Sequence, residues 1–156
     1  MNSSIENIVQ SNIDVSKNLV IALSGGVDSS VLAHIICKIS KNIRLVFVQH
    51  NQVHSKDLEV SAEKVAKSLN LDLEVIQTNL KSNSSETEMR DERYKHLLSN
   101  LKKDEVLLTG HNLSDKAETL LINLFRGTRL EGLKSINSEN SLSSKPMINI
   151  SKKEIY

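Results

Sequence analysis

Short apolar runs alternate along this chain with longer segments in which apolar residues recur every three or four positions. The apolar runs predict buried strands at 18–23, 43–48, 71–76 and 105–109. The helical spacing predicts a short helix near 4–11 and longer ones at 28–40, 56–69, 86–101 and 114–126. Because strands that alternate with helices are typical of βαβ units, we predict an α/β protein with a parallel sheet. Acidic residues alternate along the third strand, which places it at a sheet edge.

The pattern weakens after Gly127. One or two helical turns are expected at 130–136, a Ser- and Asn-rich loop at 137–144 and a fifth strand at Pro146–Ile150. Ser151 and Glu154 then form a capping box, which is the signal that opens a helix, although the chain ends at Tyr156. We therefore expect a single domain over residues 1–156 that is truncated at its C-terminal end.

Composition and charge exclude several classes of protein. The net charge of +1 gives no strong overall field for nucleic acid, and an aromatic content of 3% does not favour a base-stacking surface. The one cysteine, Cys37, excludes a disulfide framework and a cysteine zinc site. The N-terminus has no secretory pattern and no apolar stretch reaches the length of a membrane span, so we expect a soluble cytoplasmic protein that does not contact membranes.

The strongest chemical signal is the loop between the first strand and the next helix. Two of the chain's 5 glycines lie in it, in the sequence Ser24-Gly25-Gly26-Val27-Asp28-Ser29-Ser30. Backbone N–H groups of such a loop, with a helix N-terminus behind them, bind phosphate. Asp28 would lie beside that phosphate, and Mg²⁺ is the ordinary cation that bridges two such anions. The loop predicts a Mg²⁺–pyrophosphate site. The simpler interpretation is a tight turn with Asp28 as helix N-cap.

A second group of polar residues follows the fourth strand. His111 comes first, and Asp115 and Glu118 share a face at the start of the next helix, which Arg126 and Gly127 close. In a doubly wound sheet of order 3-2-1-4-5, the first and fourth strands are neighbours and ligands bind at their carboxyl ends. Both loops would then face one crevice. Alternatively, Asp115 and Glu118 only cap the helix.

These segments resemble known families. The sequence S-G-G-V-D-S at 24–29 is similar to the signature of PP-loop ATP pyrophosphatases, which split ATP between the α and β phosphates. From about residue 18 to 156, the chain resembles the tRNA(Ile)-lysidine synthases within that class. The matching segments are V-F-V-Q-H at 46–50, E-T-E-M-R-D-E-R-Y at 86–94, T-G-H-N-L-S-D-K-A-E-T at 109–119, R-G-T-R-L-E-G-L at 126–133 and K-P-M-I at 145–148.

The resemblance implies a Rossmann-like, doubly wound, five-stranded parallel sheet of the adenine nucleotide alpha hydrolase-like type. It also implies ATP and Mg²⁺ as cofactors, and as partners free L-lysine and an isoleucine tRNA with a CAU anticodon. The wobble cytidine of that tRNA is adenylated at its C2 oxygen, and the lysine amine then displaces AMP. This is a C–N bond-forming ligase reaction.

The resemblance also assigns roles to individual residues. Asp28 would hold Mg²⁺, while Asp115 and Glu118 would bind the lysine ammonium and supply a general base. His111 and Arg126 would stabilise phosphate or transition-state charge. The nucleotide would be bound by Ser24, Gly25, Gly26, Val27, Asp28, Ser29, Ser30, Val48 and Arg90. For Arg90 and Arg93, salt bridges along their own helix are the alternative interpretation.

The chain departs from the family pattern in ways that keep two further functions open. Met89, Ser114 and Arg129 replace the usual small residue, acidic residue and glycine, and the family's C-terminal tRNA-binding domains are missing from the match. The chain could therefore be a PP-loop ligase that acts on another RNA or on a small molecule. It could also be a non-catalytic ATP-binding remnant. The sequence leaves its oligomeric state open.

Overall fold

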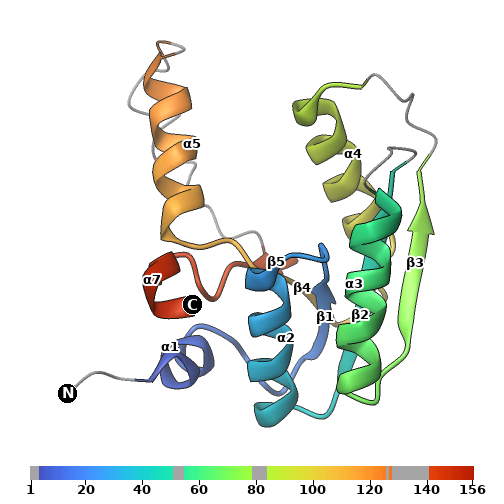
Figure 1. Cartoon of the computed structure of the whole chain (residues 1–156). Coiled ribbons are helices and arrows are strands. Elements are labelled where there is room, and N and C mark those ends of the chain that lie inside the picture. The colour runs from blue at the N-terminus through green and yellow to red at the C-terminus, as the bar shows by residue number, and fades with distance from the viewer. Residues whose placement is uncertain (1–3, 51–54, 79–83, 126, 128–140) are drawn as a thin grey trace.

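A five-stranded parallel sheet forms the centre of the computed structural model, which describes residues 4–50, 55–78, 84–125, 127 and 141–156 (Figure 1). The strand order is β3-β2-β1-β4-β5, which confirms the predicted topology. The strands are β1 (Asn18–Ala22), β2 (Ile43–Gln49), β3 (Leu73–Gln77), β4 (Glu105–Thr109) and β5 (Ser143–Ser144). The helices are α1 (Ile5–Ser11), α2 (Val27–Ile39), α3 (Ser55–Ser68), α4 (Glu86–Ser99), α5 (Leu113–Phe125) and α7 (Lys152–Ile155).

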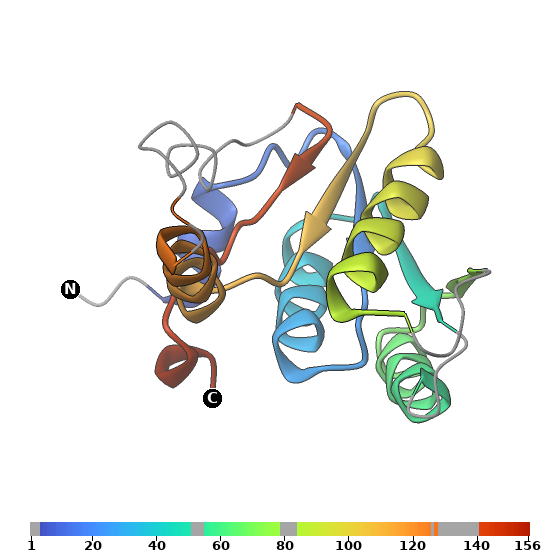
Figure 2. The same ribbon diagram turned by 90° about the horizontal axis from the view of Figure 1, so that it is seen from above.

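The apolar residues of the strands pack into a separate core on each face of the sheet. On one face, Ile21 of β1 lies with Leu32 and Ile36 of α2 and with residues of α1, α3 and α7. On the other face, Val20 and neighbouring strand residues pack against Leu97 of α4. Figure 2 shows α4 on the opposite side of the sheet from α2 and α3. The sheet is therefore covered on both faces, as the runs of apolar residues in the central strands indicate.

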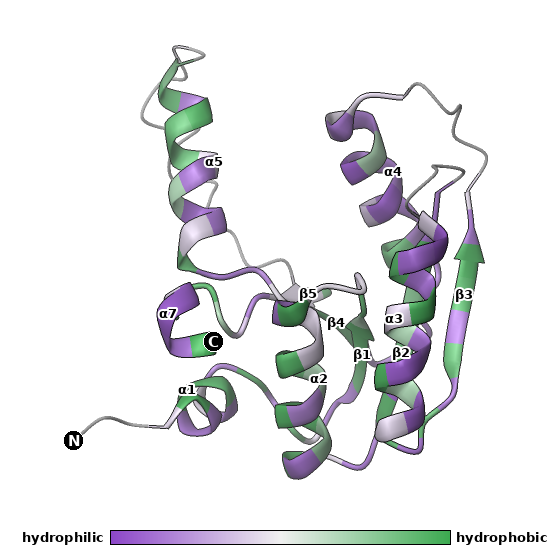
Figure 3. Cartoon of the chain, in the orientation of Figure 1, coloured by the Kyte–Doolittle hydropathy of each residue, from purple (hydrophilic) through white to green (hydrophobic). Residues whose placement is uncertain are grey.

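Helix α5 departs from this layered arrangement. It leaves the carboxyl end of β4 and projects away from the sheet, and Figure 3 shows hydrophobic residues along much of its length. Gly127 follows the helix with a φ of 68° and donates its N–H to the carbonyl of Leu124, so it is the C′ glycine that the sequence predicts.

The prediction of a fifth strand at Pro146–Ile150 is wrong. β5 is the residue pair Ser143–Ser144, which pairs with Leu107 and Leu108 of β4. The chain turns over the next residues, where the N–H of Ile148 bonds to the carbonyl of Lys145 and that of Ile150 to Met147. This turn buries Met147 and Ile150 together on the core, whereas an extended strand would point two residues three apart to opposite faces.

The other predicted elements are found within a few residues of their expected bounds, and β3 is an edge strand. The capping box at Ser151 and Glu154 opens α7 as predicted. The helical turns predicted at 130–136 lie outside the described residues. No helix in the described ranges is long and apolar enough to cross a membrane.

Candidate active site

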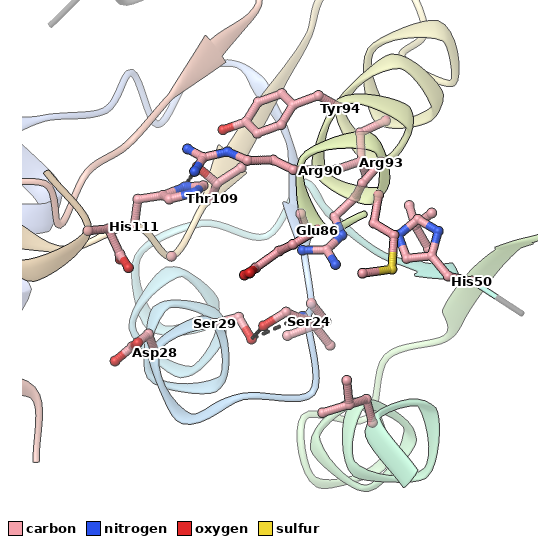
Figure 4. Close-up of a pocket in the computed structure, with 18 of the residues that line it drawn as sticks. Ser24, Asp28, Ser29, His50, Glu86, Arg90, Arg93, Tyr94, Thr109 and His111 are labelled. Atoms are coloured by element: carbon pink, nitrogen blue, oxygen red, sulfur yellow. Dashed lines mark hydrogen bonds between the residues drawn. The ribbon is translucent and has the colours of Figure 1, made fainter. Parts of the chain in front are cut away.

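A cleft of about 660 Å³ opens at the carboxyl ends of β1, β2 and β4. α4 forms one wall and the first turns of α5 form part of another, and Figure 4 shows the side chains that line it. The cleft brings together eight of the residues that sequence reasoning selects: Ser24, Asp28, Ser29, Val48, Arg90, His111, Asp115 and Glu118. The crevice expected between the phosphate loop and the second polar group is therefore present.

The phosphate loop owes its shape to Gly25. Its φ is 77°, and a Cβ there would lie 2.3 Å from the carbonyl oxygen of Leu58 on α3. Only glycine satisfies both constraints. The buried hydroxyl of Ser29 closes the loop by accepting the N–H of Ser24 at 3.1 Å and donating to the carbonyl of Gly26 at 3.0 Å. This network fixes the loop before any ligand binds.

The remaining loop residues face a different surface. Gly25, Gly26, Val27 and Ser30 line an outer groove between α2 and α3, and the Ser30 hydroxyl donates to the carbonyl of Gly26 at 2.8 Å. Their part in nucleotide binding stays a prediction, and for the glycines it would act through backbone N–H groups. Arg126, the last predicted catalytic residue, lies outside the described residues.

Asp28 is not the cap of α2, because Gly26 is the N-cap and Asp28 lies within the first helical turn. One carboxylate oxygen, Oδ2, accepts a hydrogen bond from the side-chain amide of Asn112 at 3.2 Å. The other, Oδ1, is buried and has no hydrogen-bond partner among the described residues. A buried carboxylate oxygen without a donor suits a hard cation. Mg²⁺ fits here, because it commonly takes one or two protein carboxylates and fills its other positions with water and phosphate oxygens.

Asn112 connects the two halves of the cleft. It is fully buried, and besides its bond to Asp28 its Oδ1 accepts the backbone N–H of Ser114 at 2.8 Å. The N–H of Asp115 also donates to this oxygen at 3.3 Å, which makes Asn112 the N-cap of α5, and the N–H of Asn112 donates in return to Asp115 Oδ2 at 2.9 Å. The capping interpretation therefore holds for one oxygen of Asp115. Asp115 nevertheless lines the cleft, as does the exposed Glu118 one helical turn later.

Gly110 allows the two loops to approach each other. A Cβ at this position would lie 2.8 Å from the backbone nitrogen of Ser29, at the start of α2. Because that contact is with backbone, it could not be relieved by rotating a side chain. Gly110 therefore lets the segment after β4 lie directly against the phosphate loop.

His111 is half-buried and neutral near pH 7. Burial, with a smaller contribution from the nearby charges of Lys145 and Arg90, lowers its pKa to about 4. Its ring stacks on Tyr94 of α4 with 6.2 Å between ring centroids, and its Nδ1 lies 2.9 Å from the hydroxyl of Thr109. In the absence of ligand, the imidazole is placed to donate or accept a hydrogen bond and does not supply a positive charge.

α4 supplies the positive charge of the cleft. Arg90 is exposed and Arg93 is half-buried, and the pKa of Arg93 is lowered by burial and by the neighbouring Arg90. Neither arginine has an ion-pair partner in the part of the chain that the structure describes, since Glu92 pairs with Lys95 and His96 instead. The alternative of salt bridges along the helix therefore does not hold there. Figure 4 shows Glu86 and Arg93 extending from α4 into the cleft.

Three further residues in or beside the site were not selected from the sequence: Asn112, Lys145 and His50. Lys145 directly follows β5, at the same carboxyl edge as the other site residues, and that position was an available signal. His50 occupies the equivalent position after β2 and lines the cleft. Asn112 gave no signal, because its role depends on contact with a residue 84 positions away.

Comparison with known proteins identifies relatives of the whole chain. The tRNA(Ile)-lysidine synthase of Shewanella woodyi is 35% identical over 164 residues, a match that covers 96% of this chain and 35% of the relative. That of Buchnera aphidicola subsp. Schizaphis graminum is 36% identical over 151 residues and 89% of this chain. The chain thus spans about a third of the length of these curated relatives.

Solved structures share the fold at lower identity. The U34-tRNA thiolase NcsA of Methanococcus maripaludis matches with a TM-score of 0.74 and 20% identity, over 97% of this chain and 60% of that one. The NH3-dependent NAD synthetase of Campylobacter jejuni matches with a TM-score of 0.60 and 18% identity, over 97% and 67% of the two chains. The model of the PP-loop domain family matches residues 1–156. This chain belongs to the PP-loop domain family.

Proposed function

We propose that this chain carries out the ATP-dependent step of lysidine synthesis in the cytoplasm. In this reaction, lysine is ligated to C2 of the wobble cytidine of an isoleucine tRNA with a CAU anticodon. The observation that carries the proposal is that the phosphate loop and the polar residues at the start of α5 lie in one cleft. The phosphate loop with Asp28 and the helix start with Asp115 and Glu118 face each other, and Asn112 bonds to both sides. The similarity to lysidine synthases supports the choice of substrates.

The phosphate side of the cleft suits the first half of this reaction. Ser24 and Ser29 would lie against the β and γ phosphates at the positive end of α2, where developing charge on pyrophosphate is stabilised. Asp28 would hold Mg²⁺ through its unpartnered Oδ1. When bound, that ion neutralises charge on the phosphate oxygens as pyrophosphate leaves. Arg90 and Arg93 would lie close enough to contact the α-phosphate or the RNA backbone.

The α5 side suits the second half. Asp115 and Glu118 present two carboxylates to the cleft, and a lysine side chain carries the complementary ammonium group. One of these carboxylates would accept a proton from the amine so that it can attack C2. His111 is neutral, and its imidazole could hydrogen-bond an oxygen at the reacting centre without repelling the incoming ammonium.

The direct test is product formation by the purified chain. The chain would be incubated with ATP, Mg²⁺, lysine and an unmodified isoleucine tRNA transcript, and the digested RNA analysed by nucleoside mass spectrometry. We expect lysidine to form only when all four components are present. A transcript in which uridine replaces the wobble cytidine is the matched control. If no lysidine forms at high enzyme concentration, the proposal fails for the chain in isolation.

Measurement of AMP and pyrophosphate release distinguishes lysidine synthesis from the two alternative functions. Release without tRNA would support a PP-loop ligase with a small-molecule substrate, and binding of ATP without any turnover would support a non-catalytic module. Sulfur transfer of the kind performed by a thiolase with a [4Fe-4S] cluster finds no support here. The chain has one cysteine, Cys37, whose pKa is raised by burial and which does not line the cleft.

A further inference from the structure

The cleft wall formed by α4 is anchored mainly through the C-terminal half of that helix. Leu97 is the one residue of α4 that is buried in the described part of the chain, and Tyr94 and Leu98, which pack beside it, lie in the same half. Residues 86–92 join neither core among the described residues. In Figure 1, the first turns of α4 extend beyond the tip of β3. The direction of the helix therefore depends on what holds its C-terminal end.

Arg44 of β2 lies close to that end. Side chains along a strand alternate between the two faces of the sheet, so Arg44 shares a face with Val46 two residues later. Val46 belongs to the core that α4 covers, which places Arg44 on the same face at the amino end of β2. The cleft opens at the opposite end of this strand. Arg44 is half-buried there, beneath the end of α4.

Two carboxylates hold the Arg44 guanidinium in one orientation. Its Nε and Nη2 donate to the two oxygens of Glu105 on β4, at 3.1 and 2.7 Å. Its Nη1 donates to Glu74 on β3 at 2.5 Å. A guanidinium that is paired in this forked manner has a fixed plane as well as a fixed position. Three strands are thus tied to one rigid group.

The same guanidinium binds the last residue of α4. Nη1 of Arg44 donates to Asn100 Oδ1 at 2.7 Å, and Nη2 donates to the backbone carbonyl of Asn100 at 3.1 Å. The side-chain amide of Asn100 donates in turn to Glu74 at 2.8 Å. Asn100 is the C-cap of α4, where a positive charge also complements the helix dipole. We call Arg44, Glu74, Asn100 and Glu105 together the Arg44 anchor.

The length of α4 turns a small movement at this anchor into a larger one at the cleft. Ten residues separate Asn100 from Arg90, which is about 15 Å along a helix. A tilt of about 4° at one end would then move the other end by about 1 Å. A displacement of that size at a substrate-binding group can lower a reaction rate by up to about 100-fold, even when its cause lies far from the chemistry.

We propose that Arg44 is a positioning residue, which fixes α4 through Asn100 and so holds Arg90 and Arg93 at the cleft. The inference rests on the proposed function, in which the two arginines contact phosphate groups of the substrates. No member of the Arg44 anchor is among the described residues that line the cleft, so each acts through α4 and not on a substrate.

Asn100→Ala tests the link between the anchor and the reaction. The variant removes the side-chain bonds of Asn100, while the pairing of Arg44 with Glu105 remains and the backbone N–H of Asn100 still bonds to His96. We expect kcat/KM for AMP release with tRNA and lysine to fall about 10-fold. Ser99→Ala is the matched control, because its exposed hydroxyl contacts the His96 carbonyl and no member of the anchor. An unchanged kcat/KM in folded Asn100→Ala protein would overturn the inference.

Arg44→Lys asks whether the forked geometry is required. Lysine keeps the positive charge but cannot pair with both oxygens of Glu105 and reach Asn100 at once. We expect a loss of kcat/KM in the same range as for Asn100→Ala. Full activity of Arg44→Lys would contradict a role that depends on the fixed plane of the guanidinium.

A double-mutant cycle separates positioning from a general loss of stability. If the anchor acts through the two arginines, Asn100→Ala should reduce kcat/KM by less than about 2-fold in a chain that already carries Arg90→Ala and Arg93→Ala. If it only supports the fold, its effect should be the same in both backgrounds. Equal effects in the two backgrounds would therefore overturn the inference.

Titration of His111 by NMR provides a readout that does not depend on activity. The ring of His111 stacks on Tyr94 of α4, and burial together with the charges of Lys145, Arg90 and Arg93 lowers its pKa to about 4. Tilting of α4 in Asn100→Ala should raise this pKa toward 6.5, whereas Ser99→Ala should leave it unchanged. The same pKa in Asn100→Ala as in the unmodified chain would overturn the inference. If the unmodified chain releases no AMP, the proposed function fails, while this titration still decides whether the anchor positions α4.

Discussion

The helices that follow the two central strands, α2 and α5, are anchored very differently. α2 buries Ser29, Leu32, Ala33, Ile35 and Ile36. α5 buries none of its residues against the described part of the chain, and Phe125 at its end is 89% exposed. Both helices have the same length and a comparable apolar content. The phosphate side of the cleft is thus built into the core, while the carboxylate side depends on contacts at the first turn of α5.

Those first-turn contacts are few and mostly polar. Asn112 bonds to Asp28, the N–H of Leu113 donates to the carbonyl of Ile150, and Lys116 reaches the side chain of Asn149 at 3.0 Å. Local opening is easier where few apolar contacts must be broken. We infer that the α5 side adjusts to its ligand while the α2 side does not, and the predictions below test this difference.

Replacement of Asp28 should produce the largest change. Asp28→Asn removes the carboxylate charge that would hold Mg²⁺, and we expect the rate of AMP release with tRNA and lysine to fall about 10³-fold, as for a loss of several kcal/mol. The Mg²⁺ dependence of ATP binding should weaken in parallel. Asp57→Asn, an exposed position outside the cleft on α3, is the matched control. If Asp28→Asn keeps normal Mg²⁺ dependence, the assignment of Asp28 is wrong.

Alanine substitutions at two glycines, one on each side of the cleft, allow the α2 side and the α5 side to be compared by their effect on the free energy of unfolding. Gly25 and Gly127 have similar positive φ angles of 77° and 68°. A Cβ on Gly25 meets the backbone of Leu58, whereas a Cβ on Gly127 has no described atom within 4 Å. We expect Gly127→Ala to lower the free energy of unfolding by about 1 kcal/mol from backbone strain alone. Gly25→Ala should lower it by about 3 kcal/mol because overpacking adds to the strain. Equal losses in urea denaturation would contradict the comparison.

Much of this architecture follows from the sequence because periodicity records burial. The strands, their order and the position of both polar loops follow from apolar spacing together with the rules for parallel sheets. A strand was wrongly predicted at residues 146–150 because their apolar content resembles that of a strand. The segment instead forms a turn that begins at Pro146 and buries Met147 together with Ile150. The exposure of α5 could not be predicted either, since an amphipathic pattern does not reveal what covers it.

The site shows the same division between local and non-local information. Asp28, His111 and Asp115 stand in recognisable motifs, and the structure brings them to one cleft. Asn112 and Asn100 are ordinary polar residues in the sequence. Their importance comes from hydrogen bonds to Asp28 and to Arg44, each formed only when distant strands align.

Asn112→Asp tests the link between the two sides. Aspartate still caps α5, so the capping contribution to stability should change by less than about 1 kcal/mol, while a second carboxylate buried beside Asp28 should lower the free energy of unfolding. The new carboxylate would face Asp28, however, and like charges at this distance repel. We expect the rate of AMP release to fall about 10-fold. Asn112→Ala removes both the cap and the hydrogen bond to Asp28, and it should also lower both stability and rate. If Asn112→Asp has the activity of the unmodified chain, Asn112 does not position the two sides.

The stability of the protein should depend on pH through His111. Its pKa is lowered from 6.5 to about 4 in the folded state, so the unfolded chain binds more protons between these values. The contribution of His111 is therefore present above pH 6.5 and is lost as pH falls toward 4. His111→Gln should flatten this part of the stability curve, measured by urea denaturation from pH 7 to pH 4. Lys145→Met should flatten it partly, because Lys145 helps to lower the pKa.

The smallest effect is expected at the far end of α5. Phe125→Ser replaces the most exposed large apolar side chain of the described residues, and its ring contributes little to the described core. We expect the free energy of unfolding to change by less than about 0.5 kcal/mol. Leu32→Ala in α2 is the contrasting variant, since this residue is fully buried and its truncation should lower stability by about 3 kcal/mol. A large loss for Phe125→Ser would show that α5 is anchored along its length after all, and would remove the basis for an adjustable carboxylate side.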